Sequence, residues 1–201
     1  MTRFPSFAAA WLLATLAFMG CASAPPAATG PETLIDGPGG LNNWISIGGG
    51  NWRALDGAIV ADDKLSDASA FLVSHKSYKD FHVHAEFWAS SDTNSGIFLR
   101  CADVRPITDR SCYEANIFDR RPEPTFGTGA IVHFSKVIPM PKAAGKWNTY
   151  DITVKGNHIT VMLNGVKTAE AQDDRFASGP IALEYGGGSQ VKFRKVEIRP
   201  L

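Results

Sequence analysis

The side chains that could move protons gather in one stretch of the chain, between residues 112 and 133. Glu114 alternates away from Tyr113 and Ala115 in YEANIF, as expected for a residue on the polar face of a strand. His133 lies further along the same stretch, and an imidazole suits proton transfer near neutral pH. A carboxyl and an imidazole are typical partners in general acid–base catalysis, so Glu114, His133 and Asp119 are our catalytic candidates.

Each candidate also has a structural interpretation. Glu114 could be a surface carboxylate opposite a lysine, and His133 could be a structural histidine. Asp119 precedes a turn, where aspartate most often caps the backbone, although it could also orient a base or bind a cation. The sequence alone leaves these alternatives open.

Large planar or forked side chains form a second set. Such groups can stack on sugar rings or bind hydroxyls. Arg100 could hold hydroxyls or an enolate, or it could be a structural partner of Glu86 or Glu114. The predicted substrate-binding residues are Arg100, Glu86, Tyr113, Asn116 and Trp88.

Metal ligands are less clearly indicated. His82 and His84 share one face of a strand at i, i+2, but the sequence places no third ligand beside them. The acidic turn of Asp62, Asp63 and Asp67 lacks the glycine and closing glutamate of an EF-hand. No glycine-rich nucleotide motif follows a strand. We therefore expect no required cofactor, while a divalent cation stays open.

The elements that must position these residues are short strands. FHVHAEFWA (81–89) alternates apolar and polar residues, as do segments around GIFLRC, YEANIF, GPIALEYGG and QVKFRKVEIRPL. TYDITVKGNHITVMLNGV predicts two hairpins, with turns at Gly156-Asn157 and Asn164-Gly165. Residues 167–177 are the one helix candidate. Many short strands without crossover helices favour a single antiparallel sandwich.

Composition excludes several classes of protein. The 201 residues are 44% hydrophobic and 20% charged, and 20 basic residues balance 20 acidic ones. This balance argues against a disordered chain and gives no net field that would attract nucleic acid. We predict no nucleic-acid partner, and the sequence does not determine the oligomeric state.

The sequence predicts different roles for the three cysteines. An apolar run after Arg3 ends at Cys21, which is typical of a secretory signal with a bacterial lipobox. Residues 1–20 would then be the signal peptide and Cys21 the lipidated residue. Residues 21–32 would form a flexible tether. Ala22 after the cysteine favours the periplasmic face of the outer membrane, and cleavage near Ala24 would instead give a soluble periplasmic protein. The membrane would be contacted only through the lipid. Export allows Cys101 and Cys112 to form a disulfide at the base of a hairpin loop.

Six ordered segments resemble one bacterial family. They are NSGIFLR (94–100), CYEANIFD (112–119), GTGAI (127–131), AGKWNTYDI (144–152), ITVMLNGV (159–166) and VKFRKVEI (191–198). The chain from residue 33 to 201 is similar to the DUF1080 domain, also called the 3-keto-disaccharide hydrolase domain. The resemblance implies a single concanavalin A-like jelly roll of two curved antiparallel sheets with a sugar on the concave face. Glu184 stands where the family often has glutamine, which implies a substrate contact there.

The resemblance also implies a reaction. A ketone at C3 of a sugar acidifies the proton on C2, so a modest base can remove it and the C1 substituent can leave; water then adds to the product. We expect 3-keto-glycoside cleavage of this kind. The alternatives are a carbohydrate-binding surface lipoprotein without catalysis and a structural lipoprotein whose strand face meets another envelope protein.

Overall fold

The computed structural model describes residues 1–2 and 30–201 of the chain. Cys21, nearly all of the predicted signal peptide and most of the predicted tether lie outside the described residues. In the part that is described, no helix is both long enough and apolar enough to cross a membrane.

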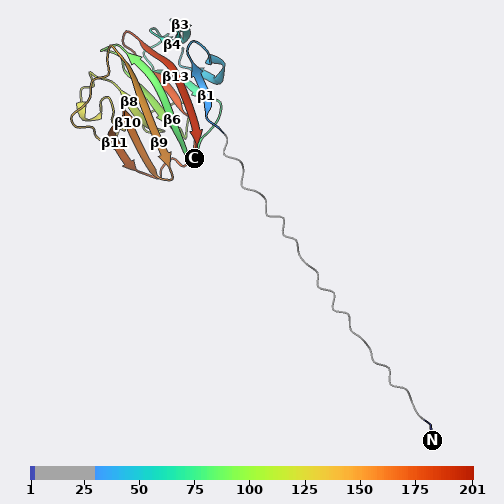
Figure 1. Ribbon diagram of the computed structural model, residues 1–201. Coiled ribbons are helices and arrows are strands. Elements are labelled where there is room, and N and C mark those ends of the chain that lie inside the picture. Colours follow the sequence, from blue (N-terminus) through green and yellow to red (C-terminus); the bar gives the residue numbers. More distant parts are fainter. Residues whose placement is uncertain (3–29) are drawn as a thin grey trace.

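Two antiparallel sheets make up the domain, and Figure 1 shows the strands of the larger one side by side. The larger sheet runs in the order β11 (Val166–Gln172), β10 (His158–Leu163), β9 (Trp147–Lys155), β6 (Phe81–Ala89), β13 (Val191–Pro200), β4 (Ala58–Ala61) and β3 (Arg53–Leu55), with β1 (Glu32–Asp36) also paired to β13. The smaller sheet runs β2 (Trp44–Ile47), β5 (Ala70–Ser74), β12 (Ala182–Tyr185), β7 (Ser95–Leu99) and β8 (Tyr113–Ile117). The other regular elements of the described residues are two short 3-10 helices, η1 (Leu41–Asn43) and η2 (Pro124–Phe126). The predicted all-β sandwich is confirmed.

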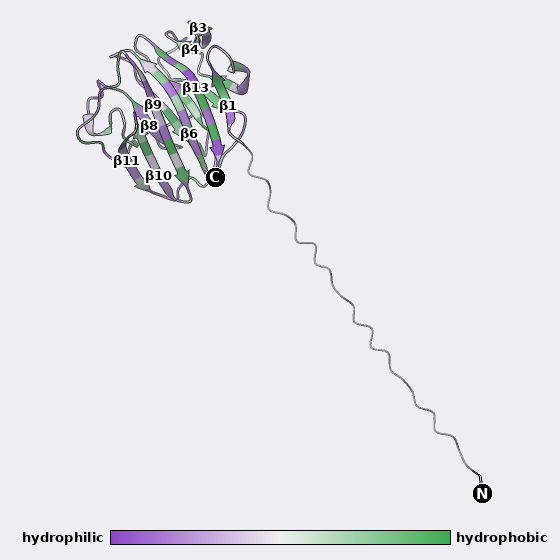
Figure 2. Cartoon of the chain, in the orientation of Figure 1, coloured by the Kyte–Doolittle hydropathy of each residue, from purple (hydrophilic) through white to green (hydrophobic). Residues whose placement is uncertain are grey.

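The core lies between the sheets and is built by strict alternation. In β6, Phe81, Val83, Ala85 and Phe87 are fully buried, while the residues between them are only partly buried. Figure 2 shows this alternation as green and purple bands along the front strands. Ala85 pairs with Tyr150 of β9, whose ring centroid lies 4.9 Å from that of Phe87. The hydrophobic effect therefore fixes the register, because a shift by one residue would turn every apolar side chain outward.

The predicted hairpin turn at Asn164-Gly165 is confirmed. Leu163 of β10 pairs with Val166 of β11 and encloses a two-residue loop. Asn164 has φ 51° and Gly165 has φ 78°, and a type I′ turn requires positive φ at both positions. Asparagine and glycine are the residues that adopt this conformation most easily.

The helix considered for residues 167–177 is wrong. Residues 166–172 form β11, which pairs with β10 at the edge of the larger sheet. Ala169 and Ala171 are buried against the core, so the segment follows the two-residue period of a strand. Pairing with an available strand edge outweighs the helix propensity of its alanine, glutamate and lysine residues.

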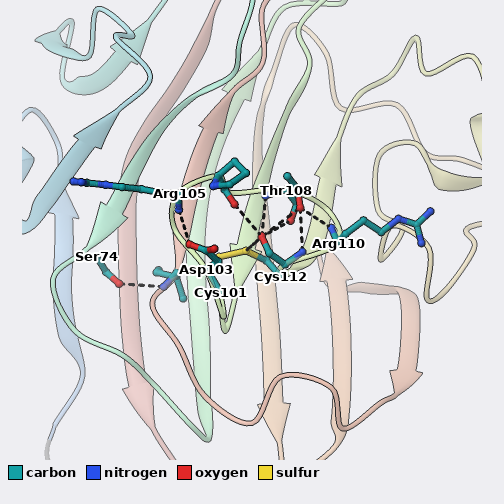
Figure 3. Close-up of a disulfide and its surroundings, with 10 residues drawn as sticks. Ser74, Cys101, Asp103, Arg105, Thr108, Arg110 and Cys112 are labelled. Carbon is teal, nitrogen blue, oxygen red and sulfur yellow. Dashed lines mark hydrogen bonds between the residues drawn. A yellow bond between two sulfur atoms is a disulfide. The ribbon is translucent and has the colours of Figure 1, made fainter.

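A disulfide joins Cys101 and Cys112, as predicted, and closes the loop between β7 and β8 (Figure 3). The loop folds over the outer face of the smaller sheet, because Ile107 packs there in a second apolar cluster. The buried members of this cluster are Phe71, Val73, Phe98, Cys101, Ile107, Cys112 and Ala182. The outer face is therefore partly filled by apolar side chains, and only the remainder can form a site.

Replacing both Cys101 and Cys112 by serine should lower the free energy of unfolding by about 3 kcal/mol, because the bridge restricts a short loop in the unfolded chain. Urea unfolding of the oxidised protein and of the double variant measures the difference. An unchanged midpoint with an unchanged slope would contradict this expectation.

Candidate active site

Two glutamates point outward from the smaller sheet. Glu114 lies in β8 and Glu184 in β12, and β7 runs between these strands. Their neighbours in sequence, such as Ala115 and Leu183, face the core, so both carboxyls lie on the opposite, outer face. Each glutamate is only 5% exposed, which is unusual for a charged residue at a sheet surface.

Both carboxyls line one cavity of about 230 Å³. The rings of Phe71 and Phe98, in edge contact with 5.3 Å between centroids, form part of its apolar lining. The disulfide-bonded loop supplies one wall and the segment after β8 another. The lining residues are Ser69, Phe71, Asn94, Phe98, Ile107, Thr108, Asp109, Glu114, Arg121 and Glu184. Seven of these ten residues are polar or charged, so the cavity offers mainly hydrogen-bonding groups, which suit a polar small molecule.

Two glycines make room for the carboxyls. A Cβ at Gly96 would lie 3.0 Å from Glu114 Oε1, and a Cβ at Gly186 would lie 3.1 Å from Glu184 Oε1 and 2.3 Å from Asn94 Nδ2. Gly96 is the second residue of β7, and a glycine inside a strand otherwise weakens it. The absence of a side chain there keeps space beside the Glu114 carboxyl.

Burial raises the pKa of Glu184 from its ordinary value of 4.5 to about 7, and the nearby Asp109 adds to the rise. Three contacts act in the other direction: Ser69 Oγ donates a hydrogen bond of 2.7 Å to Oε1, and Lys64 and Arg121 contribute positive charge. The other oxygen, Oε2, is buried without a hydrogen-bond partner among the described residues. An unpartnered buried oxygen is costly unless a ligand or a proton satisfies it.

Burial also raises the pKa of Glu114 well above its ordinary value, and the negative charges of Glu184 and Asp109 reinforce the effect. Arg121 is the one group that opposes it. Glu184 receives a hydrogen bond and more positive charge, so it ionises first and Glu114 keeps its proton to higher pH. Two carboxyls with different proton affinities in one cavity can serve as an acid and a base.

Sequence reasoning missed Asp109 and Arg121. Asp109 lies in the disulfide-bonded loop, and Arg121 follows the CYEANIFD segment by two residues; both face the cavity. The Arg121 side chain makes no hydrogen bond or ion pair with any described residue, so its guanidinium is free to bind a ligand oxygen. Asp109 could have been identified from the sequence because it lies in the loop that the predicted disulfide closes. Nothing in the sequence distinguished Arg121 from Arg120.

The structure corrects the predicted position of Arg100. Its side chain is buried away from the cavity and binds the backbone that surrounds the end of β7. Nη1 donates to Gly156 O at 2.7 Å and to Phe176 O at 3.2 Å, and Nη2 contacts Asp80 Oδ1 at 3.0 Å. With φ 49°, Arg100 leaves the alternation of its strand, so its position could not be derived from parity.

Three more predicted substrate contacts lie elsewhere. Tyr113 is fully buried in the core, where its hydroxyl donates to Asp173 Oδ1 at 2.7 Å. Glu86 and Trp88 lie on the outer face of the larger sheet, on the opposite side of the sandwich; Glu86 pairs with Arg194, and Lys192 Nζ lies 5.2 Å from the Trp88 ring centroid. The alternation of β6 was predicted correctly, but the sequence did not reveal that β6 and β8 belong to different sheets.

The remaining candidates surround the site without lining the cavity. Asn116 is buried two residues after Glu114 and donates to Phe126 O at 2.7 Å. Asp119 accepts hydrogen bonds from Thr128 Oγ1 and from the backbone amides of residues 143 and 144, which is a capping role. His133 contacts Asp109 Oδ2 through Nε2 at 2.7 Å and therefore reaches the cavity only through that aspartate.

The candidate metal ligands do not gather around a cation site. His84 pairs with Asp151 across the larger sheet and His82 lies diagonal to it; their ring nitrogens are 2.8 Å and 3.5 Å from Asp151 Oδ1. Asp62 instead forms an ion pair with Arg53 at 2.7 Å. Within residues 1–2 and 30–201, no group of three or more acidic, histidine or cysteine side chains is arranged to hold a metal ion.

These features define a jelly-roll β-sandwich with a carboxyl-lined cavity on one face. The chain belongs to the family of 3-keto-alpha-glucoside-1,2-lyase-like domains, whose family model matches residues 30–199. No curated protein matches the chain significantly.

Solved structures show the same fold. A predicted glycosyl hydrolase of Parabacteroides distasonis is 25% identical with a TM-score of 0.69, over 86% of this chain and all of that chain. A Bacillus subtilis protein with a galectin-like fold is 14% identical with a TM-score of 0.65, over 86% and 97% of the two chains. A carbohydrate-binding module of Bacillus subtilis is 17% identical with a TM-score of 0.57, over 86% and 97%. The predicted family and jelly-roll fold are confirmed.

Replacing Gly96 by alanine should lower kcat about tenfold with little loss of stability. The new methyl group would lie 3.0 Å from Glu114 Oε1 and would displace the carboxyl by a few tenths of an ångström. Steady-state kinetics with the substrate proposed below, together with a melting curve, test this. Unchanged kcat in a folded variant would show that the Glu114 position is not critical.

Proposed function

We propose that this protein cleaves 3-keto-glycosides by elimination and hydration, with Glu184 as the base and Glu114 as the acid. The observation that supports this most directly is the pair of buried carboxyls with raised pKa values in one cavity. Such a pair suits a reaction that removes one proton and delivers another. The family to which the chain belongs supplies the class of substrate.

In the first step, ionised Glu184 accepts the proton from C2 of the oxidised sugar. The electrons of the C2–H bond move toward the C3 carbonyl and form an enolate. The guanidinium of Arg121, on the cavity wall, is the positively charged group of the lining and can bind the enolate oxygen. A positive donor aimed at developing negative charge lowers the barrier for this step.

In the second step, the enolate electrons form the C1–C2 double bond and the bond from C1 to the leaving oxygen breaks. Glu114 gives its proton to that oxygen, so the second sugar or alcohol leaves neutral. Glu114 is then a carboxylate and can deprotonate the water that adds to C1, while Glu184 returns a proton to C2. Elimination and hydration together consume one water and restore both carboxyls.

Incubation of the purified full chain with 3-keto-trehalose or a 3-keto-glucoside tests the proposal. Release of free sugar is expected from the oxidised substrate. The matched control is the unoxidised parent glycoside, which should stay intact because its C2 proton is not acidic. Absence of turnover on the oxidised substrate would contradict the proposal, as would equal cleavage of both.

A binding-only surface protein is the second candidate. The mainly polar lining of the cavity favours it, since hydroxyl, amide and charged side chains can bind sugar hydroxyls without chemistry. Calorimetry with unoxidised glycans separates the two functions: binding of ordinary glycans without consumption of any 3-keto-glycoside would favour the second candidate.

We also propose that the protein is exported and acts at the periplasmic face of the outer membrane, attached through Cys21. The mass of the mature N-terminus tests this directly. A diacylglycerol-modified cysteine at position 21 is expected, and an unmodified N-terminus near Ala24 would indicate a soluble periplasmic protein.

A further inference from the structure

The loop closed by the disulfide is attached to the sheet at more than one place. Cys101 and Cys112 fix its base, and Ile107 fixes its middle by packing with Phe71 and Phe98. The third attachment is polar: Asp109 Oδ2 lies 2.7 Å from His133 Nε2. Asp109 is also part of the cavity wall that contains Glu114 and Glu184.

His133 is itself fixed relative to the same cavity. The preceding residue, Val132, donates its backbone amide to Glu114 O at 3.0 Å, so the His133 segment is hydrogen-bonded to the strand of the proposed acid. His133 has φ 67°, in the left-handed region that a residue with a side chain seldom adopts. Strained residues of this kind persist where the surrounding structure requires a particular side-chain direction.

We propose that His133 is a positioning residue, which holds Asp109 and the disulfide-bonded loop against the cavity of Glu114 and Glu184. Only the kinetic part of this inference, the expected change in kcat/KM, rests on the proposed function. Asp109 stands between the histidine and the two carboxyls, so loss of the hydrogen bond would free the cavity wall without touching the acid or the base. The charged groups that face Asp109 across the cavity are Glu114, Glu184 and Arg121, besides His133 at its side.

Two variants separate this role from a merely structural one. His133→Gly removes the hydrogen bond and also relieves the unfavourable φ, so its melting temperature should stay within about 4 °C of wild type. His133→Gln keeps a donor in place of Nε2. We expect His133→Gly to lower kcat/KM about 10- to 100-fold, and His133→Gln to stay within about threefold of wild type.

Hydrogen exchange of the loop gives a readout that needs no substrate. The amides of Thr108 and Arg110, on either side of Asp109, are hydrogen-bonded inside the loop, to Ser111 Oγ at 3.0 Å and to Thr108 Oγ1 at 3.2 Å. They should exchange at least about tenfold faster in His133→Gly than in wild type and His133→Gln, because local opening exposes them.

Wild-type exchange in His133→Gly would overturn the inference, and so would equal exchange in the Gly and Gln variants. If the wild-type protein turns over no 3-keto-glycoside, the proposed function fails, and the exchange rates still decide whether His133 holds the loop.

Discussion

Replacement of Glu114 by glutamine should lower kcat on a 3-keto-glucoside by about 10³-fold, because the leaving oxygen loses its proton donor. The fold should be retained: glutamine has the shape of the protonated carboxyl, and burial raises the pKa of Glu114, which favours that neutral form in the folded protein. Single-turnover release of the leaving group measures the effect. The Glu197→Gln variant, on the outer face of the larger sheet, is the matched control and should keep wild-type kcat.

Incubation with the same substrate in D2O distinguishes the roles of the two carboxyls. The Glu114→Gln variant should still exchange the C2 proton for deuterium, since Glu184 remains as base, although the leaving group stays attached. The Glu184→Gln variant should lose both exchange and cleavage. If Glu114→Gln abolished exchange while Glu184→Gln retained it, the roles that we assign to the two residues would be reversed.

Strand alternation was predictable because it follows from local chemistry. The sequence FHVHAEFWA predicts the buried and exposed residues of β6 correctly, and Asn164-Gly165 predicts its turn. The assignment of strands to sheets depends instead on pairing between distant segments. Glu86 and Glu114 have the same pattern of neighbours in sequence, yet they lie on opposite sides of the sandwich because β6 and β8 belong to different sheets.

The site was predictable only where a strand supports it. Glu114 lies on β8 and points where alternation places it, whereas Glu184 on β12 was expected at the site from the family resemblance. Arg100, at positive φ just beyond β7, and His133, at positive φ in a loop, leave regular structure, so periodicity carries no information about their direction. Asp109 and Arg121 are brought to the cavity by loops whose paths are set by the disulfide and by apolar packing.

The two carboxyls should also make the protein less stable as the pH rises. The pKa of Glu184 is 4.5 in its ordinary state and about 7 in the folded protein. Between these pH values the folded chain keeps a proton that the unfolded chain has released, so the free energy of unfolding falls as pH increases. Above pH 7 the loss is complete and amounts to roughly 3 kcal/mol, at 1.36 kcal/mol for each pKa unit.

The Glu184→Gln variant should therefore match wild type at pH 4 and exceed its free energy of unfolding by roughly 2–3 kcal/mol at pH 8. Urea unfolding at both pH values measures the difference, and Glu197→Gln should follow the wild-type pH dependence. Equal stabilities of Glu184→Gln and wild type at pH 8 would show that the Glu184 carboxyl is not held in a costly environment. A variant that is more stable and yet unable to exchange the C2 proton would show that the cavity keeps an unfavourable buried carboxyl for its chemistry, as expected where function and stability compete for one residue.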